Sequence, residues 1–336
     1  MRKIILYTIL FVLLCFIIPI IFTKKNNNMQ TSELIAQNEE KTAFAKNEEI
    51  TNYDYKQYSK VVLLHTKTGI IEELPLDEYL YGVVSSEMPA SFEEEALKAQ
   101  AVVARTYTIY KILHNNKHEG ANICDDSSCC QAWISKEDRF AKWGKDKEDY
   151  WNKIVSAVDS TKGKIVTYNN EPINAFFHSN SGGKTETTLN VWGGDNYPYL
   201  QSVATSGEEA YSQYESEAIF TKKEFIDKIK ENYSNFSIDF TNEDCIKVLE
   251  YTESGRIKKI KIGNIEFPGV EVRSIFKLKS ANFKISIEED SIKFEVIGYG
   301  HGVGMSQTGA DSMAKQGCNY EEIIKHFYTG VEIQDV

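Results

Sequence analysis

A proline at position 89 separates two stretches of helical pattern and constrains how the chain around it can fold. The residue before a proline avoids helical backbone angles, so the first helix is expected to end near Glu87. Ser91 is followed three residues later by Glu94, which resembles a capping box and predicts the start of a second helix. These signals predict a helix–turn–helix with the carboxylate of Glu87 at the junction, where it can form the wall of a cleft.

The second helix carries two cations whose spacing gives them a common face. Lys98 and Arg105 are two turns apart, so they are expected to face the same space as Glu87. A second interpretation is a solvated surface helix in which Glu94 and Lys98 form an ion pair one turn apart. The residue pattern alone leaves both interpretations open.

The N-terminal segment has the pattern of a membrane anchor. Residues 4–22 are uncharged and almost wholly apolar, which is close to the length needed to span a bilayer. Arg2 and Lys3 precede this segment and favour a cytoplasmic N-terminus. No cleavage site of small residues follows, so residues 1–25 are predicted to be a cytoplasmic tip and an uncleaved signal anchor. The rest of the chain would then lie outside the cytoplasmic membrane.

Composition separates a spacer from a folded domain. Residues 26–57 are rich in Asn, Glu, Lys, Gln and Thr and are predicted to be a flexible linker. Residues 58–336 mix helical and strand patterns, and period-two patterns at about 206–290 indicate a β-rich second lobe. The predicted fold class is α+β, a two-lobed mixed domain preceded by one transmembrane helix. Further signals predict a hairpin around Lys67-Thr68-Gly69, helices over 148–160 and 320–328, strands over 164–168 and 173–178, and a capped helix from Thr221.

The formal net charge of −11 narrows the range of ligands. An excess of acidic side chains repels nucleic acids and anionic membrane surfaces, so neither is expected as the main ligand, and no nucleic-acid partner is predicted. A neutral substrate fits this average better, although a local basic patch would override it.

Three cysteines and a histidine lie close together in the sequence. The thiols of Cys124, Cys129 and Cys130 and the imidazole of His118 can supply four ligands for a tetrahedral zinc ion, with His114 as a substitute. The spacing differs from that of a standard zinc finger, and an exported protein also permits disulfides, so both states remain open. A site with three thiolates would hold a structural metal rather than a catalytic one, and no organic cofactor is indicated.

Two glycine-rich loops carry side chains suited to a sugar ligand. Residues 177–185 contain His178 and paired glycines that let backbone approach a ligand, and Trp192 follows with an aromatic face that suits a sugar ring. The alternative is a surface loop with Trp192 buried in the core. Residues 298–310 carry His301, which is expected either to line a cleft or to bind a local carbonyl group.

Four segments in this order resemble the stage II sporulation protein D family, which is related to the amidase enhancer proteins. The segments are SSEMPASFEEEALKAQAVVARTY from residue 85, ICDDSSCCQAW from residue 123, FFHSNSGGKTE from residue 176 with VWGGDNYPYL from residue 191, and GYGHGVGMSQTGA from residue 298. Four separated motifs in a fixed order are far more specific than any one of them alone. They extend over roughly residues 60–330, and the predicted anchor also fits the family.

The resemblance implies a function and a cellular setting. Members of the family are lytic transglycosylases that act on peptidoglycan during engulfment of the forespore. This implies a two-lobed α+β catalytic domain and a glycan stripped of its stem peptides as the substrate. It also implies a single-pass cell-membrane protein with its catalytic domain outside the cytoplasm, on the mother-cell side of the space around the forespore. The implied partners are the stage II sporulation proteins P and M.

The resemblance also assigns roles to individual residues. The family's catalytic acid falls on Glu87. Residues expected to hold glycan are Lys98, Arg105, His178, Lys184, Tyr199 and His301. The family's metal motif usually reads Cys, four residues, His-Cys, so Cys129 stands here where relatives have histidine, and His118 is expected to be the fourth ligand.

A single carboxyl group suffices for the implied reaction. Most glycosidases need two carboxylates, whereas a lytic transglycosylase takes its nucleophile from the substrate. Glu87 is expected to protonate the oxygen that links N-acetylmuramic acid to N-acetylglucosamine, and then to remove the proton from the C6 hydroxyl as a 1,6-anhydro ring closes. It must start protonated, so surroundings that raise its pKa are expected.

Two other classes of function remain open. A non-catalytic peptidoglycan-binding activator of a wall amidase would bind glycan without turnover, as the amidase enhancers suggest. A zinc peptidase or amidase would instead use the cysteine cluster for catalysis.

Overall fold

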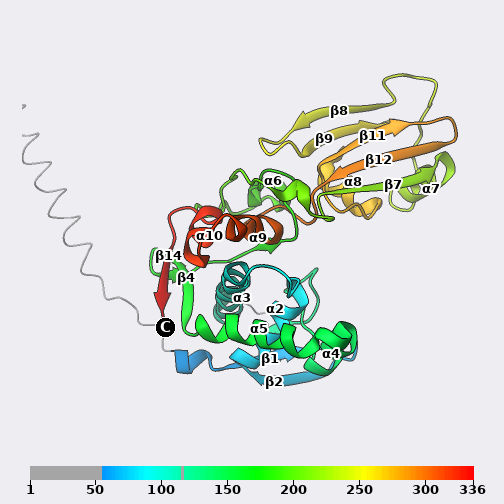
Figure 1. Ribbon diagram of the computed structural model, residues 1–336. Helices are drawn as coiled ribbons and strands as arrows, with labels where there is room; N and C mark the ends of the chain where they lie inside the picture. Colours follow the sequence, from blue (N-terminus) through cyan, green and yellow to red (C-terminus); the bar gives the residue numbers. More distant parts are fainter. Residues whose placement is uncertain (1–54, 115–116) are drawn as a thin grey trace, which may run out of the picture. The chain divides into compact units, whose positions relative to one another are not determined.

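The computed structural model describes residues 55–114 and 117–336, and the predicted anchor and nearly all of the predicted linker lie outside the described residues. Within these two ranges, no helix is long and apolar enough to cross a membrane. The described chain combines helices with several small sheets (Figure 1), which confirms the α+β class.

A buried helix forms the centre of the first lobe (Figure 1). Most residues of α3 (Glu94–His114) are fully enclosed, and its many alanines allow other helices to approach closely. The helices that pack against it are α2 (Leu76–Glu87), α5 (Lys147–Ser160), α9 (Gln307–Lys315) and α10 (Tyr320–Phe327). Of these, α5 and α10 confirm two helices predicted from the sequence.

Two small sheets and one strand pair complete this lobe. β1 (Lys60–Leu64) and β2 (Ile71–Pro75) form the predicted hairpin, and β3 (Ile123–Cys124) runs parallel to β1. In the second sheet, β4 (Lys164–Tyr168) pairs with β5 (Glu171–Pro172) and with β14 (Glu332–Asp335).

The strand predicted over residues 173–178 is shorter than expected. β6 (Phe177–His178) pairs in parallel with β13 (Met305–Ser306), so the two glycine-rich loops lie next to each other. The remaining elements of this lobe are α4 (Lys136–Trp143), α6 (Thr188–Trp192) and the 3-10 turns Tyr55–Tyr58, Gly144–Asp146 and Glu208–Ala210.

The turn between α2 and α3 forms as predicted at one end only. α2 ends at Glu87, as the proline two residues later requires. α3 begins at Glu94, so the capping box predicted at Ser91 is wrong. The backbone N–H of Glu93 instead donates to the carboxylate of Asp311 in α9 at 2.6 Å. A contact from another helix therefore fixes the start of α3.

Residues 215–297, the second lobe, hold two three-stranded antiparallel sheets around a separate hydrophobic core. The strand orders are β10-β9-β8 and β11-β12-β7. The capping box predicted at Thr221 is confirmed, because its hydroxyl and the side chain of Glu224 bind each other's backbone N–H groups. The domain boundaries drawn from the sequence stay predictions.

The second lobe contains two helices besides its strands. Its elements are β7 (Glu215–Thr221), α7 (Lys222–Lys230), β8 (Ile246–Tyr251), β9 (Ile257–Ile262), β10 (Ile265–Pro268), α8 (Gly269–Ile275), β11 (Phe283–Ile287) and β12 (Ser291–Ile297). Phenylalanine rings fill the core between them, with Phe225 and Phe276 stacked at a centroid distance of 4.9 Å.

A buried carboxylate joins the loops of the first lobe. Glu208 is 1% exposed and accepts hydrogen bonds from the backbone N–H groups of Ser181 and Gly183, each at 3.0 Å. The hydroxyl groups of Ser181, Thr205 and Ser306 donate to it as well. Burial alone would raise the pKa of this carboxyl, but these donors outweigh burial and hold the pKa at about 2. Since Ser306 is the N-cap of α9, Glu208 ties the first glycine-rich loop to the start of that helix.

Replacing Glu208 by glutamine is expected to lower the free energy of unfolding by about 3 kcal/mol at neutral pH, because the pKa falls from 4.5 to about 2 on folding. This contribution is present above pH 4.5 and is lost as the pH falls towards 2. Urea unfolding of both proteins at pH 7 and at pH 3.5 measures it, and the difference should shrink at the lower pH. The exposed neighbour Glu209 provides the control, since Glu209→Gln should change stability by less than about 0.5 kcal/mol. An equal loss at both pH values would contradict this account.

Candidate active site

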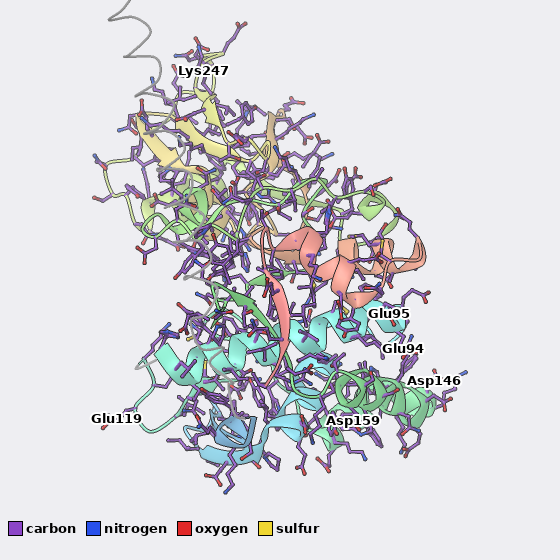
Figure 2. All side chains as sticks on the ribbon, turned by 90° about the vertical axis from the view of Figure 1, so that its left-hand side faces the viewer. Glu94, Glu95, Glu119, Asp146, Asp159 and Lys247 are labelled. Carbon is purple, nitrogen blue, oxygen red and sulfur yellow. The ribbon has the colours of Figure 1, made fainter. Side chains whose placement is uncertain are left out.

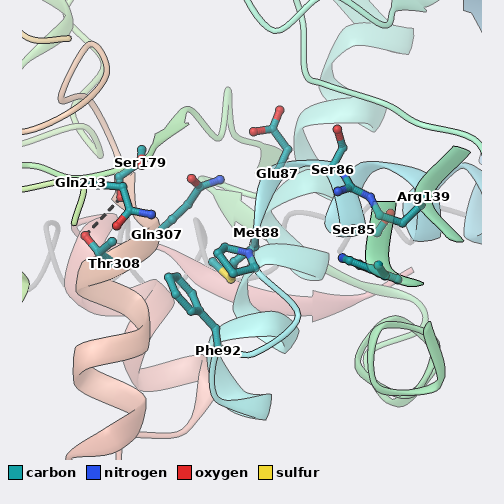
Figure 3. A pocket seen from close by; sticks show the side chains of 12 residues that line it. Ser85, Ser86, Glu87, Met88, Phe92, Arg139, Ser179, Gln213, Gln307 and Thr308 are labelled. Atoms are coloured by element: carbon teal, nitrogen blue, oxygen red, sulfur yellow. Dashed lines mark hydrogen bonds between the residues drawn. The ribbon is translucent and has the colours of Figure 1, made fainter. Parts of the chain in front are cut away.

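Glu87 lies at the C-terminal end of α2, where several segments of the first lobe meet. Its Oε1 atom accepts a hydrogen bond from the backbone N–H of Ala132 at 2.5 Å. The side chain of Gln307, the first residue of α9, lines the same cavities as Glu87, and its amide donates to the side-chain oxygen of Gln100 at 3.3 Å. Figure 3 shows Gln307 extending from α9 towards Glu87. Three segments that are far apart in the sequence therefore converge on one carboxyl group.

Two cavities meet at Glu87. The first cavity, of about 240 Å³, lies between the ends of α2 and α4 and the start of α9 (Figure 3). The second cavity has a volume of about 610 Å³, which is typical of ligand sites. It extends from Glu87 past the loop that carries Cys129 and Cys130, the cysteine loop, to the two glycine-rich loops. Glu87, Ser179 and Gln307 line both cavities. The structure thus places Glu87 in the wall of a cleft, as the sequence predicts.

The surroundings of Glu87 raise its pKa from 4.5 to about 7. Burial is the main cause, because it disfavours the charged form of the carboxyl group. The hydrogen bond from Ala132 and the nearby amide of Gln307 lower the pKa but compensate only in part. A carboxyl group with this pKa is substantially protonated near neutral pH, as a general acid requires.

Aromatic rings line the second cavity beside two histidines. The ring centroids of Trp192 and His301 are 5.0 Å apart, and those of Trp192 and Phe176 are 4.8 Å apart. Trp192 is 51% exposed, so the alternative of a tryptophan buried in the core is wrong. An exposed aromatic face in a cavity wall suits a ligand with an apolar ring surface.

The histidines of the second cavity are uncharged at neutral pH. Burial, followed by the positive charge of Arg256, lowers the pKa of His178 to about 4. Burial also lowers the pKa of His301, with added effects of His178 and Arg273. The Nδ1 atom of His178 donates to the carbonyl oxygen of Val303 at 3.1 Å, while its Nε2 atom has no hydrogen-bond partner within the described chain. That Nε2 atom is enclosed, so the side chains around it would have to move before a ligand hydroxyl group could reach it.

Two of the residues expected to hold glycan are buried elsewhere. Arg105 is fully enclosed because α3 lies inside the lobe, and its guanidinium donates to the carbonyl oxygens of Val158, Thr161 and Lys164 at 2.8 to 3.2 Å. It joins α3 to the end of α5 and cannot contact a ligand in this arrangement. Tyr199 is 6% exposed, and its hydroxyl accepts a hydrogen bond from the backbone N–H of Asn174. Both residues support the fold.

The two lysines expected to hold glycan also lie away from the cavities. Lys98 forms ion pairs with Glu94 and Glu95, each at 2.8 Å, which confirms the predicted Glu94–Lys98 pair, although α3 itself is buried and is not a solvated surface helix. Lys184 donates to the carbonyl oxygen of Glu253 in the second lobe at 3.2 Å. Neither lysine lines the first or the second cavity. Of the six expected glycan contacts, the two histidines are the ones that line a cavity.

His118, Cys124, Cys129 and Cys130 come together in one cluster, as predicted. The Nε2 atom of His118 lies 3.4 Å from the sulfur of Cys130 and 3.6 Å from that of Cys129, and these sulfurs are 3.9 Å apart. Neighbouring ligands of a tetrahedral zinc ion are about 3.4 to 3.8 Å apart, given the usual Zn–S and Zn–N bond lengths. The cluster therefore fits a tetrahedral metal ion with four protein ligands. The described cysteines form no disulfide, and His114 is not part of the cluster.

The metal-ligand cluster and Glu87 share one loop. Both adjacent cysteines line the second cavity, and Ala132, whose N–H binds Glu87, follows two residues later. Between them, the buried side chain of Gln131 donates to the hydroxyl groups of Tyr79 in α2 and Thr108 in α3, each at 2.9 Å. A metal ion that orders this loop would also hold the hydrogen-bond donor of Glu87 in place.

Several residues that shape the site carry no local signal in the sequence. Gln307 lies within the fourth motif, and its position there is the one hint that the sequence offers. Glu208 and Asp311 shape the site indirectly, because they accept hydrogen bonds from the backbone N–H groups of Ser181 and Glu93. Arg139 and Arg273 line the first and second cavities from α4 and α8, elements that no motif covers.

Comparisons with known proteins agree with this site. A family model described as SpoIID, stage II sporulation protein, matches residues 64–168. Stage II sporulation protein D of Bacillus subtilis (strain 168) is 36% identical over 278 residues, covering 82% of this chain and 79% of that protein. The protein of the same name from Bacillus amyloliquefaciens is 35% identical over 278 residues, covering 82% and 78%. The amidase enhancer of Bacillus subtilis (strain 168) is 29% identical over 306 residues, covering 76% of this chain and 40% of the relative.

These relatives place the chain among the bacterial sporulation proteins. The chain belongs to the stage II sporulation protein D family, as its four motifs predict. The matched segment 64–168 includes Glu87, the turn after it and the cysteine loop.

Replacing Glu87 by glutamine is expected to stabilise the fold at alkaline pH. A carboxyl whose pKa rises from 4.5 to about 7 on folding weakens the folded state progressively as the pH rises through this window, by at most about 3 kcal/mol. Glu87→Gln removes this cost, so its free energy of unfolding should exceed that of the wild type by up to about 3 kcal/mol at pH 8 and match it near pH 4.5.

Chemical unfolding across this pH range provides the measurement. Glu119→Gln removes the same charge at an exposed position (Figure 2) and should show no such pH-dependent gain. A Glu87→Gln protein that is less stable than the wild type at pH 8 would show that the carboxylate is favoured in the folded state.

Proposed function

We propose that this chain is a peptidoglycan lytic transglycosylase of sporulation. It would cleave the bond from N-acetylmuramic acid to N-acetylglucosamine in glycan strands that lack stem peptides, and leave 1,6-anhydro ends. The observation that carries the proposal is a single carboxyl group with a raised pKa at the meeting point of two cavities. Of the described residues that line these cavities, Glu87 is the sole carboxylic acid, which fits a reaction that needs no second carboxylate.

The proposed reaction uses Glu87 first as an acid and then as a base. Its proton passes to the glycosidic oxygen, and the bond between C1 of muramic acid and that oxygen breaks. The resulting carboxylate removes the proton from the C6 hydroxyl of the same muramic acid, and O6 forms the new bond to C1. Glu87 ends protonated, as it began, and no water is consumed.

The remaining residues of the site position the ligand and the acid. Trp192 offers an exposed face for a sugar ring, and His178 and His301 line the same cavity beside it. The hydrogen bond from the backbone N–H of Ala132 orients the carboxyl group. We assign zinc to the His118 cluster as a structural ion that orders the loop up to Ala132.

The setting of the reaction is part of the proposal. Residues 4–22 would anchor the chain in the cell membrane, with the domain on the mother-cell side of the space around the forespore. There it would act on peptidoglycan beside the stage II sporulation proteins P and M. The family membership supports a sporulation role, and the name of the related amidase enhancer supports a role at the cell wall.

One alternative has an observation of its own. Similarity to an amidase enhancer favours a glycan-binding activator that leaves the bond cutting to another enzyme. Such a protein would bind glycan in the same two cavities without needing the raised pKa of Glu87.

Digestion of peptide-stripped glycan by the full chain tests the proposed reaction. Mass spectrometry of the wild-type products should show 1,6-anhydro ends, and Glu87→Gln should reduce turnover at least about 100-fold, because it removes the proton donor. Turnover should fall as the pH rises through 7, since Glu87 is then deprotonated.

The control for this digestion is Glu119→Gln, which should cut like the wild type. Products with reducing ends only, or full activity of Glu87→Gln, would overturn the reaction. Binding without turnover would favour the activator instead.

Metal analysis tests the zinc assignment. The wild type and Cys318→Ser, which changes a thiol outside the cluster, should each contain one zinc per chain, and Cys129→Ser should contain much less. Chelation should lower the thermal midpoint of the wild type, since a structural ion stabilises the folded state alone. A metal-free protein with a disulfide among the three clustered cysteines would show that the oxidised alternative is correct.

A further inference from the structure

The two cavities beside Glu87 differ in charge from the rest of the molecule. The chain has 49 acidic residues against 38 basic ones, yet Glu87 is the one acidic residue among those that line the cavities. Each cavity instead has one arginine in its lining, Arg139 in the first and Arg273 in the second. A cation therefore lies on each side of the reacting carboxyl group, in a chain whose average charge predicts a neutral substrate.

These arginines are half-buried and have no acidic partner within the described ranges. Arg139 stacks on the ring of Trp143 at 5.3 Å from the ring centroid. Its buried Nε atom has no hydrogen-bond partner among the described residues. Figure 3 shows it reaching from α4 towards Ser86. The Nε atom of Arg273 donates to the carbonyl oxygen of Leu278 at 3.3 Å, while the side chain lines the second cavity.

The two other arginines in the described chain are used differently. Arg105 and Arg256 are enclosed, and their guanidinium groups bind several backbone carbonyl oxygens. Partial desolvation of a guanidinium without an anion is unfavourable. At Arg139 and Arg273 this cost is offset when an anionic ligand enters the cavities.

A guanidinium group prefers a carboxylate, which it can bind through two parallel hydrogen bonds. On the proposed function, the ligand supplies such groups at regular intervals. Every muramic acid of a stripped strand ends in a free lactyl carboxylate, whereas a stem peptide turns this carboxylate into an uncharged amide. One muramic acid adjoins the bond that is cut, and the next lies beyond the intervening glucosamine on the other side.

We propose that Arg139 and Arg273 bind lactyl carboxylates on opposite sides of Glu87. The two arginines therefore select strands from which the stem peptides have been removed. This inference takes its substrate from the proposed function. It adds the two arginines as the groups with which the protein distinguishes stripped glycan from intact glycan. Both act by holding the substrate, so their effect falls on KM.

Kinetics with two matched glycans test the inference on the full chain. One is stripped glycan, and the other is the same glycan with its carboxylates converted to methylamides. For the wild type, conversion should raise KM at least about tenfold with kcat changed less than about threefold. Arg273→Gln and Arg139→Gln should each raise KM for stripped glycan by a similar factor and lose much of the discrimination between the two glycans.

Two further variants separate the role of the arginines from a general effect of positive charge. Lys247→Gln removes a positive charge at an exposed position far from α3 (Figure 2) and should discriminate like the wild type. Arg273→Lys keeps the charge but not the paired donors. It should therefore recover, relative to Arg273→Gln, part of the preference for stripped glycan over the methylamide form. A Gln variant that keeps the full preference would overturn the role of that arginine.

A binding measurement separates this inference from the proposed reaction. In the Glu87→Gln background, a tetrasaccharide of alternating N-acetylglucosamine and N-acetylmuramic acid should bind at least about tenfold more tightly than a chitin tetrasaccharide, which lacks the lactyl group. When Arg139→Gln or Arg273→Gln is added to this background, the preference should be lost. That loss supports the inference even if the wild type proves unable to cut glycan. Normal cutting with equal binding of both tetrasaccharides would sink the inference and leave the proposed reaction standing.

Discussion

The carboxylate of Glu208 holds together the loops from which the site is built. Its donors come from the first glycine-rich loop, from Thr205 and from Ser306, so segments more than a hundred residues apart in the sequence meet on two oxygen atoms. Gln307 follows Ser306 directly and extends towards Glu87, so Glu208 helps to position one wall of the cavities beside Glu87. On the other side of this loop, Arg256 from the second lobe binds the carbonyl oxygen of Ser181. The two lobes and the site thus share one hydrogen-bonded centre.

The same type of side chain has opposite roles a short distance apart. Glu208 is enclosed among many donors, which keep it ionised and make it a fixed anionic anchor. Among the described residues Glu87 accepts a hydrogen bond from Ala132, and burial prevails over the groups that would lower its pKa. The number of hydrogen bonds that each carboxyl group receives therefore decides which one stabilises loops and which one can deliver a proton.

Local signals in the sequence predicted much of the fold and the centre of the site. The end of α2 at Glu87, the cap at Thr221 and the meeting of His118 with the three cysteines each depend on neighbouring residues or on chemistry with few alternatives. Arg105 and Tyr199 were expected to hold glycan but lie enclosed in the fold, and burial of this kind could not be foreseen from their place inside a family motif. The start of α3 depends on a contact with α9, and the arginines lie outside every motif, so neither could be found without the folded chain.

The position of Glu87 between two cavities has a consequence for how a wall would be degraded. A strand that fills both cavities contacts the protein on each side of the bond that breaks, whereas a fragment that ends near this bond occupies one cavity and loses the contacts of the other. On the proposed function, the enzyme would prefer long strands, and its own products would become progressively poorer substrates. The geometry of the cleft would then limit the extent of digestion without any inhibitor, leaving a shortened but not fully dismantled wall.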